Sequence, residues 1–285
     1  MTSNHQSKQV QKITALQHDD GSWGDFHSLS QPTKEQPMTT EQALRRLRVL
    51  GLTADDEPIR RALAYIERCF KGELSIPDRV EVKPDWSLFL NTMFAAWLRL
   101  FVPTHELATA VAARWAYVIE NAFAGGSFQQ ARYDEAYRTA LQPKGRRIDY
   151  FKSFVNFYPL ALLPNALSPK TERRMFDYIL DYPQDVYYIG YARPLRENPP
   201  VFASAQTSRY LATLELLAQY DVAPKKLAFA ADWLNDNKDE NGQWDLGAGA
   251  NDGIYFPVSD SWRKAADRKR DCTQRIESLL KQLRR

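Results

Sequence analysis

Three aspartates are the residues whose type and surroundings best suit them for chemistry. Asp85, Asp149 and Asp260 each stand at or near the start of a predicted helix, with an aromatic residue beside them. Such an aspartate can cap the helix, which stabilises its anion and makes it a poor general acid near neutral pH. The same carboxylates could instead donate a proton or hold a metal above an aromatic pocket. Capping is the default interpretation, and these three are the candidate catalytic residues.

Aromatic residues make up 12% of the chain and surround two predicted helices, residues 86–101 and 148–163. A helix that is apolar on every side is buried. We expect the aromatic side chains of these helices, with those of the Tyr- and Arg-containing connection 182–200, to line a pocket for an apolar small molecule. The candidate binding residues are Trp86, Trp97, Tyr150, Phe154, Tyr158, Tyr188, Arg193, Tyr255 and Trp262.

Half-exposed helices alternate along the chain with more apolar ones. The pattern predicts five outer helices, at residues 6–17, 55–70, 107–122, 169–181 and 224–234. It predicts five inner helices, at residues 41–50, 86–101, 148–163, 204–220 and 260–283. Thr39 and Thr40 are suited to cap the helix 41–50, and Pro58 to the first turn of the helix 55–70.

A short frame recurs along the chain: an aliphatic residue, a residue four positions on, and then a glycine and an aromatic residue two apart. The clear copies are Ile13, Gln17, Gly21 and Trp23; Val118, Ala122, Gly126 and Phe128; and Leu234, Lys238, Gly242 and Trp244. Weaker copies begin at Tyr65 and Tyr178. We interpret each frame as a helix end, where glycine takes positive φ and the aromatic residue packs back on the last turn. Such spacing is typical of a repeat architecture.

The Gly-Trp turns resemble the QW motif of the terpenoid cyclases, such as squalene-hopene cyclase, and of the related protein prenyltransferases. Q-H-D-D-G-S-W-G at residues 17–24 is a close match, and K-D-E-N-G-Q-W-D at residues 238–245 is a fair one. The resemblance implies an all-α fold, an α/α toroid of five outer and five inner helices around a central cavity. It covers the chain as one domain, 1–285. It also implies an isoprenoid-processing enzyme, with isomerase, lyase or prenyl transferase chemistry.

The sequence departs from that family at its acid and metal motifs. Neither D-x-D-D nor D-D-x-x-D occurs. The prenyltransferases bind zinc through Asp, Cys and His, and here Asp271 and Cys272 are adjacent but no histidine follows His105. We therefore expect no metal site and no cofactor, with Mg²⁺ needed only if the ligand carries a diphosphate.

Two other functions stay open beside the enzyme. The first is a non-catalytic toroid that binds an apolar ligand or a protein partner. The second is a toroid similar to a polysaccharide lyase, suggested by an exposed-looking Tyr/Arg connection at residues 187–196. That alternative lacks a defined pair of catalytic carboxylates.

The composition bears on the partners and the cellular location that we expect for the protein. A net charge of +3 is too small to indicate nucleic-acid binding. Cys69 and Cys272 form neither a disulfide framework nor a zinc pattern. No apolar run is long enough to cross a membrane, and the first twelve residues lack a signal-peptide core. We expect a cytoplasmic protein without a transmembrane segment.

The predicted last helix is basic. Residues 262–285 hold nine Lys or Arg against three Asp or Glu, or +6. We interpret this segment as a solvated helix face with spaced ion pairs, Arg263 with Asp267 and Asp271 with Arg275, rather than as an anion site.

Overall fold

The computed structural model describes residues 7–28, 30, 33–80, 85–144, 153–250, 259 and 262–284. Within these residues the fold is all-helical, with one isolated bridge between Asn156 and Tyr187 and no strand. The helices are α1 (Lys8–Thr14), α2 (Thr40–Val49), α3 (Glu57–Phe70), α4 (Trp86–Phe101), α5 (Glu106–Ala122), α6 (Gln130–Leu141), α7 (Phe157–Leu162), α8 (Pro169–Leu180), α9 (Ala205–Leu217), α10 (Ala223–Lys226), α11 (Ala228–Asp236) and α12 (Ala265–Leu283), with a short 3-10 turn η2 (Ala248–Ala250).

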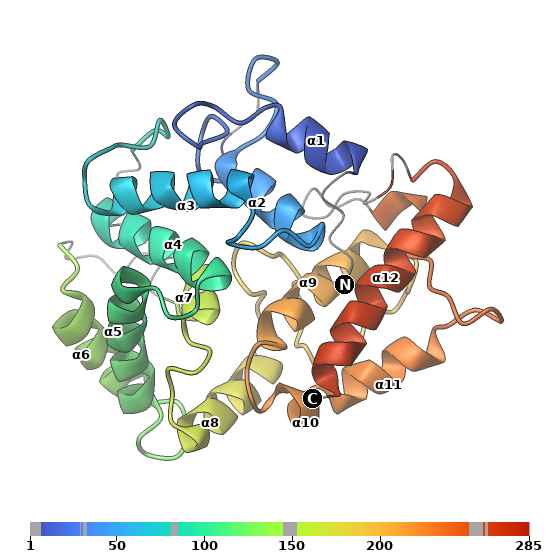
Figure 1. The fold of residues 1–285 in the computed structure, drawn as a ribbon. Helices are drawn as coiled ribbons and strands as arrows, with labels where there is room; N and C mark the ends of the chain where they lie inside the picture. The colour runs from blue at the N-terminus through green and yellow to red at the C-terminus, as the bar shows by residue number, and fades with distance from the viewer. Residues whose placement is uncertain are drawn as a thin grey trace.

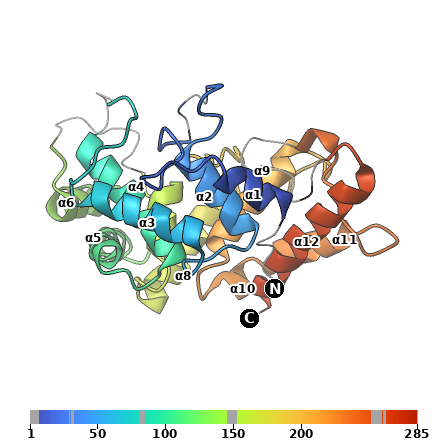
Figure 2. The same cartoon turned by 45° about the horizontal axis from the view of Figure 1, so that its top comes forward.

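The helices follow one another around the molecule, from α1 and α3 through α4, α5 and α8 to α11 and α12 (Figure 1). Contacts run between chain neighbours and also from α4 and α5 to α7, from α7 to α9, and from α9 to α12. Gln9 of α1 donates a hydrogen bond of 3.1 Å to the carbonyl of Ser259, just before α12. This bond joins the first helix to the segment before the last one. The loops before α2 and α4 rise on one side, and the C-terminus lies on the other (Figure 2).

Several predicted helices are confirmed, with boundaries set by their caps. Thr39 begins α2 in a capping box with Gln42. Pro58 lies in the first turn of α3, where its missing N–H costs no helical hydrogen bond. Helix α4 has the expected bounds, and most of its apolar side chains are buried. Periodicity and cap chemistry thus located the helices whose ends are set locally.

The prediction of one helix over residues 148–163 is wrong in its described part, because only α7 is helical there. The side chain of Asn156 caps α7 by accepting from the N–H of Tyr158 at 3.0 Å. Phe157 donates its N–H to the carbonyl of Tyr187, and Tyr187 donates to Val155. These bonds hold Asn156 extended, so that the helix begins at Phe157 with Pro159 in its first turn.

Helix α6 was not predicted. Its buried residues Tyr133, Ala136, Tyr137 and Leu141 lie on one stripe with helical spacing. It ends at Gln142, whose φ of 48° is left-handed. The expected outer helix 224–234 is divided at Leu227 into α10 and α11.

The two predicted Gly-Trp turns are confirmed, and they share the same hydrogen bonds. The indole N–H of Trp23 donates to the carbonyl of Ile13 at 2.7 Å. The indole N–H of Trp244 donates to the carbonyl of Leu234 at 2.6 Å. The glycine two residues before each tryptophan has positive φ, 97° in the first turn and 74° in the second. In each turn, the side chain of the buried tryptophan is therefore hydrogen-bonded to the helix that precedes it.

Each Gly-Trp turn is also tied to a later helix. The backbone N–H of Trp23 donates to Thr40 Oγ1 of α2 at 3.0 Å. The backbone N–H of Trp244 donates to Thr273 Oγ1 of α12 at 3.1 Å. The repeated frame thus fixes how one helix packs on another.

In two of the frames, an arginine side chain donates a hydrogen bond to a backbone carbonyl of the turn. The carbonyl belongs to the residue five positions after the aliphatic residue that begins the frame. Arg61 of α3 donates to the carbonyl of His18 at 2.6 Å. Arg174 of α8 donates to the carbonyl of Phe123 at 2.9 Å, in the middle frame, where Gly126 has a φ of 107°. The middle copy is therefore a third turn of the same kind, with Phe128 in place of tryptophan.

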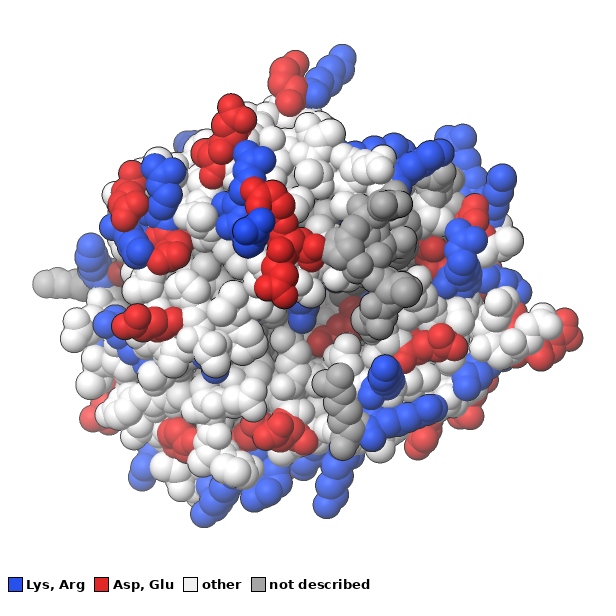
Figure 3. Space-filling view, in the orientation of Figure 1, with Lys and Arg blue, Asp and Glu red and all other residues white. Residues whose placement is uncertain are grey.

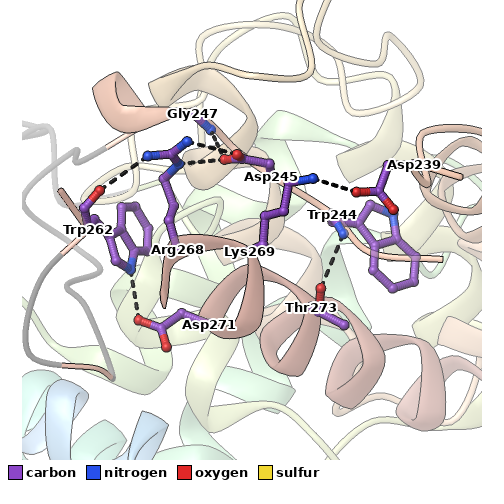
Figure 4. Close-up of polar contacts among 9 residues, drawn as sticks. All are labelled: Asp239, Trp244, Asp245, Gly247, Trp262, Arg268, Lys269, Asp271 and Thr273. Atoms are coloured by element: carbon purple, nitrogen blue, oxygen red, sulfur yellow. Dashed lines mark hydrogen bonds and ion pairs between the residues drawn. The ribbon is translucent and has the colours of Figure 1, made fainter. Parts of the chain in front are cut away.

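Ion pairs neutralise much of the basic charge of α12 (Figure 4). Arg268 makes a bidentate pair with Asp245, at 2.6 and 2.8 Å, and Lys269 contacts Asp239 at 2.7 Å. Elsewhere on this helix, Arg270 pairs with Asp267 and Arg275 with Glu215. Acidic and basic side chains are interspersed on the face drawn in Figure 3. No described helix has the length and apolar composition of a membrane span.

Replacing Asp245 with asparagine is expected to cost roughly 1 kcal/mol of unfolding free energy at neutral pH, because the pair with Arg268 is partly solvated. The hydrogen bond from Arg268 lowers the pKa of Asp245 below the ordinary value of an aspartate. Its contribution is therefore present above that value and lost as the pH falls through the folded-state pKa. The unfolding free energy of Asp245→Asn, measured with urea, should approach that of the wild type at acid pH. Asp267→Asn, which removes a more exposed pair, is the control and should change little; a deficit for Asp245→Asn that persists in acid would contradict this account.

Candidate functional site

Five aromatic side chains from four separate segments meet beside the first turns of α4 and α7. We call this group the aromatic mouth: His27, Trp86, Phe89, Tyr158 and Tyr188. Trp86 stacks on Phe89 with a centroid distance of 5.2 Å. Phe89 packs edge-on against Tyr158 at 5.8 Å and against His27 at 5.4 Å. Tyr188 lies 5.1 Å from both His27 and Tyr158.

Burial is graded across the mouth. Phe89, Tyr158 and His27 are buried, with 3%, 1% and 5% of their surface exposed. Trp86 and Tyr188 are only half-buried. Tyr188 also has a φ of 71°, a left-handed conformation that costs a residue with a side chain about 1–3 kcal/mol. The surrounding structure therefore holds the Tyr188 ring in place against a backbone preference.

A buried carboxylate lies beneath the rings. Glu41 in the first turn of α2 is 1% exposed. Its Oε1 accepts from the Trp97 indole at 2.6 Å and from the Tyr158 hydroxyl at 2.9 Å. Its Oε2 accepts from the backbone N–H of Ser28 at 2.7 Å. Glu41 thus joins α2, α4, α7 and the loop before α2.

A second carboxylate fixes the loop that carries His27. Asp78 is 8% exposed and accepts from the N–H groups of Phe26 and His27, at 2.6 and 2.8 Å, and from Ser30 Oγ at 2.8 Å. Burial, and then the charge of Asp78, raises the pKa of the neighbouring Asp25. These bonds hold the His27 ring against the other members of the mouth.

Burial raises the pKa of Tyr158 well above its ordinary value, and the nearby Glu41 raises it further. Tyr158 is therefore a neutral hydroxyl that donates to Glu41. All three contacts described above use Glu41 as an acceptor. The arrangement is suited to fixing side chains in place, and none of these contacts aims Glu41 as a proton donor.

Four of the predicted binding residues meet here. Trp86, Tyr158 and Tyr188 belong to the mouth, and Trp97 reaches it through Glu41. Asp85 caps α4 by accepting from the N–H of Leu88 at 3.1 Å, and it also accepts from the N–H of Lys144. The structure thus gives Asp85 the capping role.

Other predicted residues lie elsewhere. Phe154 belongs to a separate aromatic cluster with Phe123, Phe128, Tyr133 and Tyr178. Arg193 lies 3.7 Å from Glu197, and Trp262 donates to Asp271 at 2.8 Å. Asp149, Tyr150, Tyr255 and Asp260 lie outside the described residues.

The connection 182–200 is less exposed than expected. Tyr191 is 2% exposed, and its hydroxyl donates to the carbonyl of Glu197. Val186, Ile189 and Leu195 are also buried. The expected exposed Tyr/Arg surface at residues 187–196 is present only in part: Arg196 is exposed, Tyr187, Tyr188 and Arg193 are half-buried, and Tyr191 is buried.

Glu41, His27 and Asp78 stand in no sequence pattern that would have indicated their roles. An acidic residue in a first helical turn, as Glu41 is, is ordinary. Asp78 lies about fifty positions from the loop that it holds. Within the described residues, no group of three His, Cys, Asp or Glu side chains is arranged to bind a metal.

An open basin of about 420 Å³ lies at the other end of α4. It is formed by the C-terminal ends of α4, α7, α9 and α12 and by the start of α10. Its polar lining residues are Arg99, Asn165, Gln219, Tyr220, Asp221 and Gln282. The candidate site residues predicted from the sequence are not among those that line it.

No protein-family model, curated protein or solved structure matches the chain. A functional conclusion must therefore come from the geometry of the site itself.

Proposed function

We propose that the chain is an α/α toroid whose aromatic mouth binds an apolar, unsaturated small molecule of the isoprenoid class. Two contacts support the ring arrangement. Gln9 joins α1 to the segment before α12. Gln17, the second residue of the first frame, donates to the carbonyl of Pro58 at 2.9 Å and so joins neighbouring outer helices.

The observation that carries the binding proposal is the convergence of the five rings of the mouth, with two outer rings half-buried and three inner ones buried. Aromatic rings offer large apolar faces with little side-chain entropy to lose. Their π faces also attract electron-poor or cationic groups, by about 0.5–2 kcal/mol per contact. A ligand with several double bonds would cover Trp86 and Tyr188, the two rings that the protein leaves partly open.

Binding without catalysis is favoured over the cyclase reaction. Asp85 is engaged as a helix cap, and Glu41 accepts hydrogen bonds from three donors. A cyclase acid must be available to give up a proton in the transition state. The enzyme of isoprenoid metabolism remains the second candidate, supported by the aromatic mouth, and Mg²⁺ would assist it only with a diphosphate substrate.

Replacing Trp86 with alanine is expected to weaken binding of farnesol or geranylgeraniol at least about tenfold, because the largest half-buried ring of the mouth is lost. Quenching of intrinsic tryptophan fluorescence measures the affinity. Trp233→Ala is the matched control: Trp233 is also half-buried against aromatic rings, but in α11 beside Phe202 and Tyr210. Binding that is absent in the wild type, or weakened equally by both substitutions, would refute the proposal.

The two candidate functions separate by product analysis. Wild-type protein is incubated with farnesyl diphosphate, geranylgeranyl diphosphate or squalene, with and without Mg²⁺, and the products are read by mass spectrometry. The binding function predicts unchanged substrate. A cyclic or transferred product would establish the enzyme instead.

A further inference from the structure

The basin at the C-terminal end of α4 is a site distinct from the aromatic mouth. Trp86 and Arg99 lie in the same helix, thirteen residues apart, which places them about 20 Å from each other along its axis. Arg99 lines the basin, whereas Trp86 belongs to the mouth. The basin holds about 420 Å³ and is open to solvent, so it could admit a small molecule without opening the fold.

One cation of the basin lacks a charged partner within the described residues. Arg99 is half-buried and donates to the carbonyl of Pro164 at 2.9 Å and to Thr109 Oγ1 at 3.1 Å. Both acceptors are neutral, and no described carboxylate lies within ion-pair distance of Arg99. Burial lowers the pKa of Arg99, in keeping with a guanidinium that is partly removed from water and contacts only neutral acceptors. Since a guanidinium has five N–H donors, some of them are left for a ligand.

The opposite charge is present on the same lining. Asp221 is exposed, and it too makes no ion pair with a described residue. The start of α10 lies at the basin, and so do the C-terminal ends of α4, α7, α9 and α12. Each such end carries about half a negative charge. An anion with a single charge would be attracted by Arg99 but repelled by Asp221 and the C-terminal helix ends. A cation with a single charge would be attracted by Asp221 and the helix ends but repelled by Arg99.

We propose that the basin binds a small zwitterion of the amino-acid class. Its carboxylate would accept from the Arg99 guanidinium, and its ammonium group would lie toward Asp221 and the helix ends. The side-chain amides of Asn165, Gln219 and Gln282 line the remaining wall. They can donate to or accept from polar groups of such a ligand.

Isothermal titration calorimetry with a panel of free amino acids tests this site, with acetate and methylammonium as probes that carry a single charge. At least one amino acid is expected to bind roughly tenfold more tightly than either probe. Arg99→Gln and Asp221→Asn are each expected to weaken that binding by about tenfold or more, the loss expected for one charged hydrogen bond.

Arg174→Gln is the matched control, because Arg174 also donates to a carbonyl, that of Phe123, but lies outside the basin. It should leave amino-acid binding unchanged. The exposed Asp221 can be replaced without disturbing the core, so the test stands even if Arg99→Gln unfolds. Acetate binding as tightly as any amino acid, absence of binding by the whole panel, or insensitivity to Asp221→Asn would each overturn the proposal.

Discussion

Replacing Gly21 with alanine is expected to destabilise the protein by about 2–5 kcal/mol. Gly21 has a φ of 97°, a conformation that costs an L-residue roughly 1–2 kcal/mol. A Cβ at this position would lie 2.3 Å from the carbonyl oxygen of Arg61 and 2.7 Å from its carbonyl carbon. Both atoms belong to the backbone of α3, which cannot move aside without shifting the helix, and such overpacking adds about 1–3 kcal/mol.

Gly242→Ala is the matched control for this prediction. Gly242 occupies the equivalent position of the second Gly-Trp turn and has a φ of 74°, but no atom lies within 4 Å of a Cβ placed there. Only the cost of positive φ remains, about 1–2 kcal/mol. Urea unfolding of both variants measures the difference. Equal losses of stability would show that the contact between Gly21 and Arg61 does not constrain the fold.

The two glycines illustrate what the sequence can and cannot predict. Both turns could be recognised because glycine and tryptophan stand two residues apart after a helical pattern, and their local hydrogen bonds agree. No residue near Gly21 in the sequence predicts its close approach to Arg61, which lies forty residues further along the chain. Turn type is a local property, whereas the space around a turn is set by packing.

The same division explains the outcome for the helices. The bounds of α4 follow from an aspartate cap and a predominantly apolar run, both of which are local. The segment before α7 also carries aromatic and aliphatic residues, yet its backbone bonds to Tyr187 and does not form a helix. Long-range pairing therefore overrode the local pattern. The stripe of α6 was present in the sequence, but its polar composition concealed it.

The candidate site was only partly accessible to prediction. Abundant aromatic residues indicated Trp86, Trp97, Tyr158 and Tyr188, because large rings on buried helices must pack together. Glu41 was missed because its burial depends on groups that are 56 and 117 residues away, Trp97 and Tyr158. The burial of such a polar residue is set by contacts that are distant in sequence, so it can be recognised only from the structure.

Replacing Glu41 with alanine is expected to cost about 3–5 kcal/mol of unfolding free energy. The change removes the acceptor for three donors, the Trp97 indole, the Tyr158 hydroxyl and the N–H of Ser28. The two side-chain donors are almost fully buried. Each buried donor that is left unsatisfied costs about 1–3 kcal/mol. Urea unfolding followed by tryptophan fluorescence measures the loss, and Trp97 reports on the site directly.

Two further variants separate this account from a simple loss of packing. In Glu41→Gln, one oxygen can still accept from Trp97 and Tyr158, but the amide NH₂ then faces the N–H of Ser28, so a smaller loss of about 1–3 kcal/mol is expected. The second variant combines Tyr158→Phe with Glu41→Ala. Tyr158→Phe removes one of the donors that Glu41→Ala leaves unsatisfied, so it should lower the unfolding free energy less in the Glu41→Ala protein than in the wild type. Because only an unsatisfied hydroxyl makes the two substitutions interact in this sense, strictly additive losses would show that Glu41 acts through its volume rather than through its hydrogen bonds.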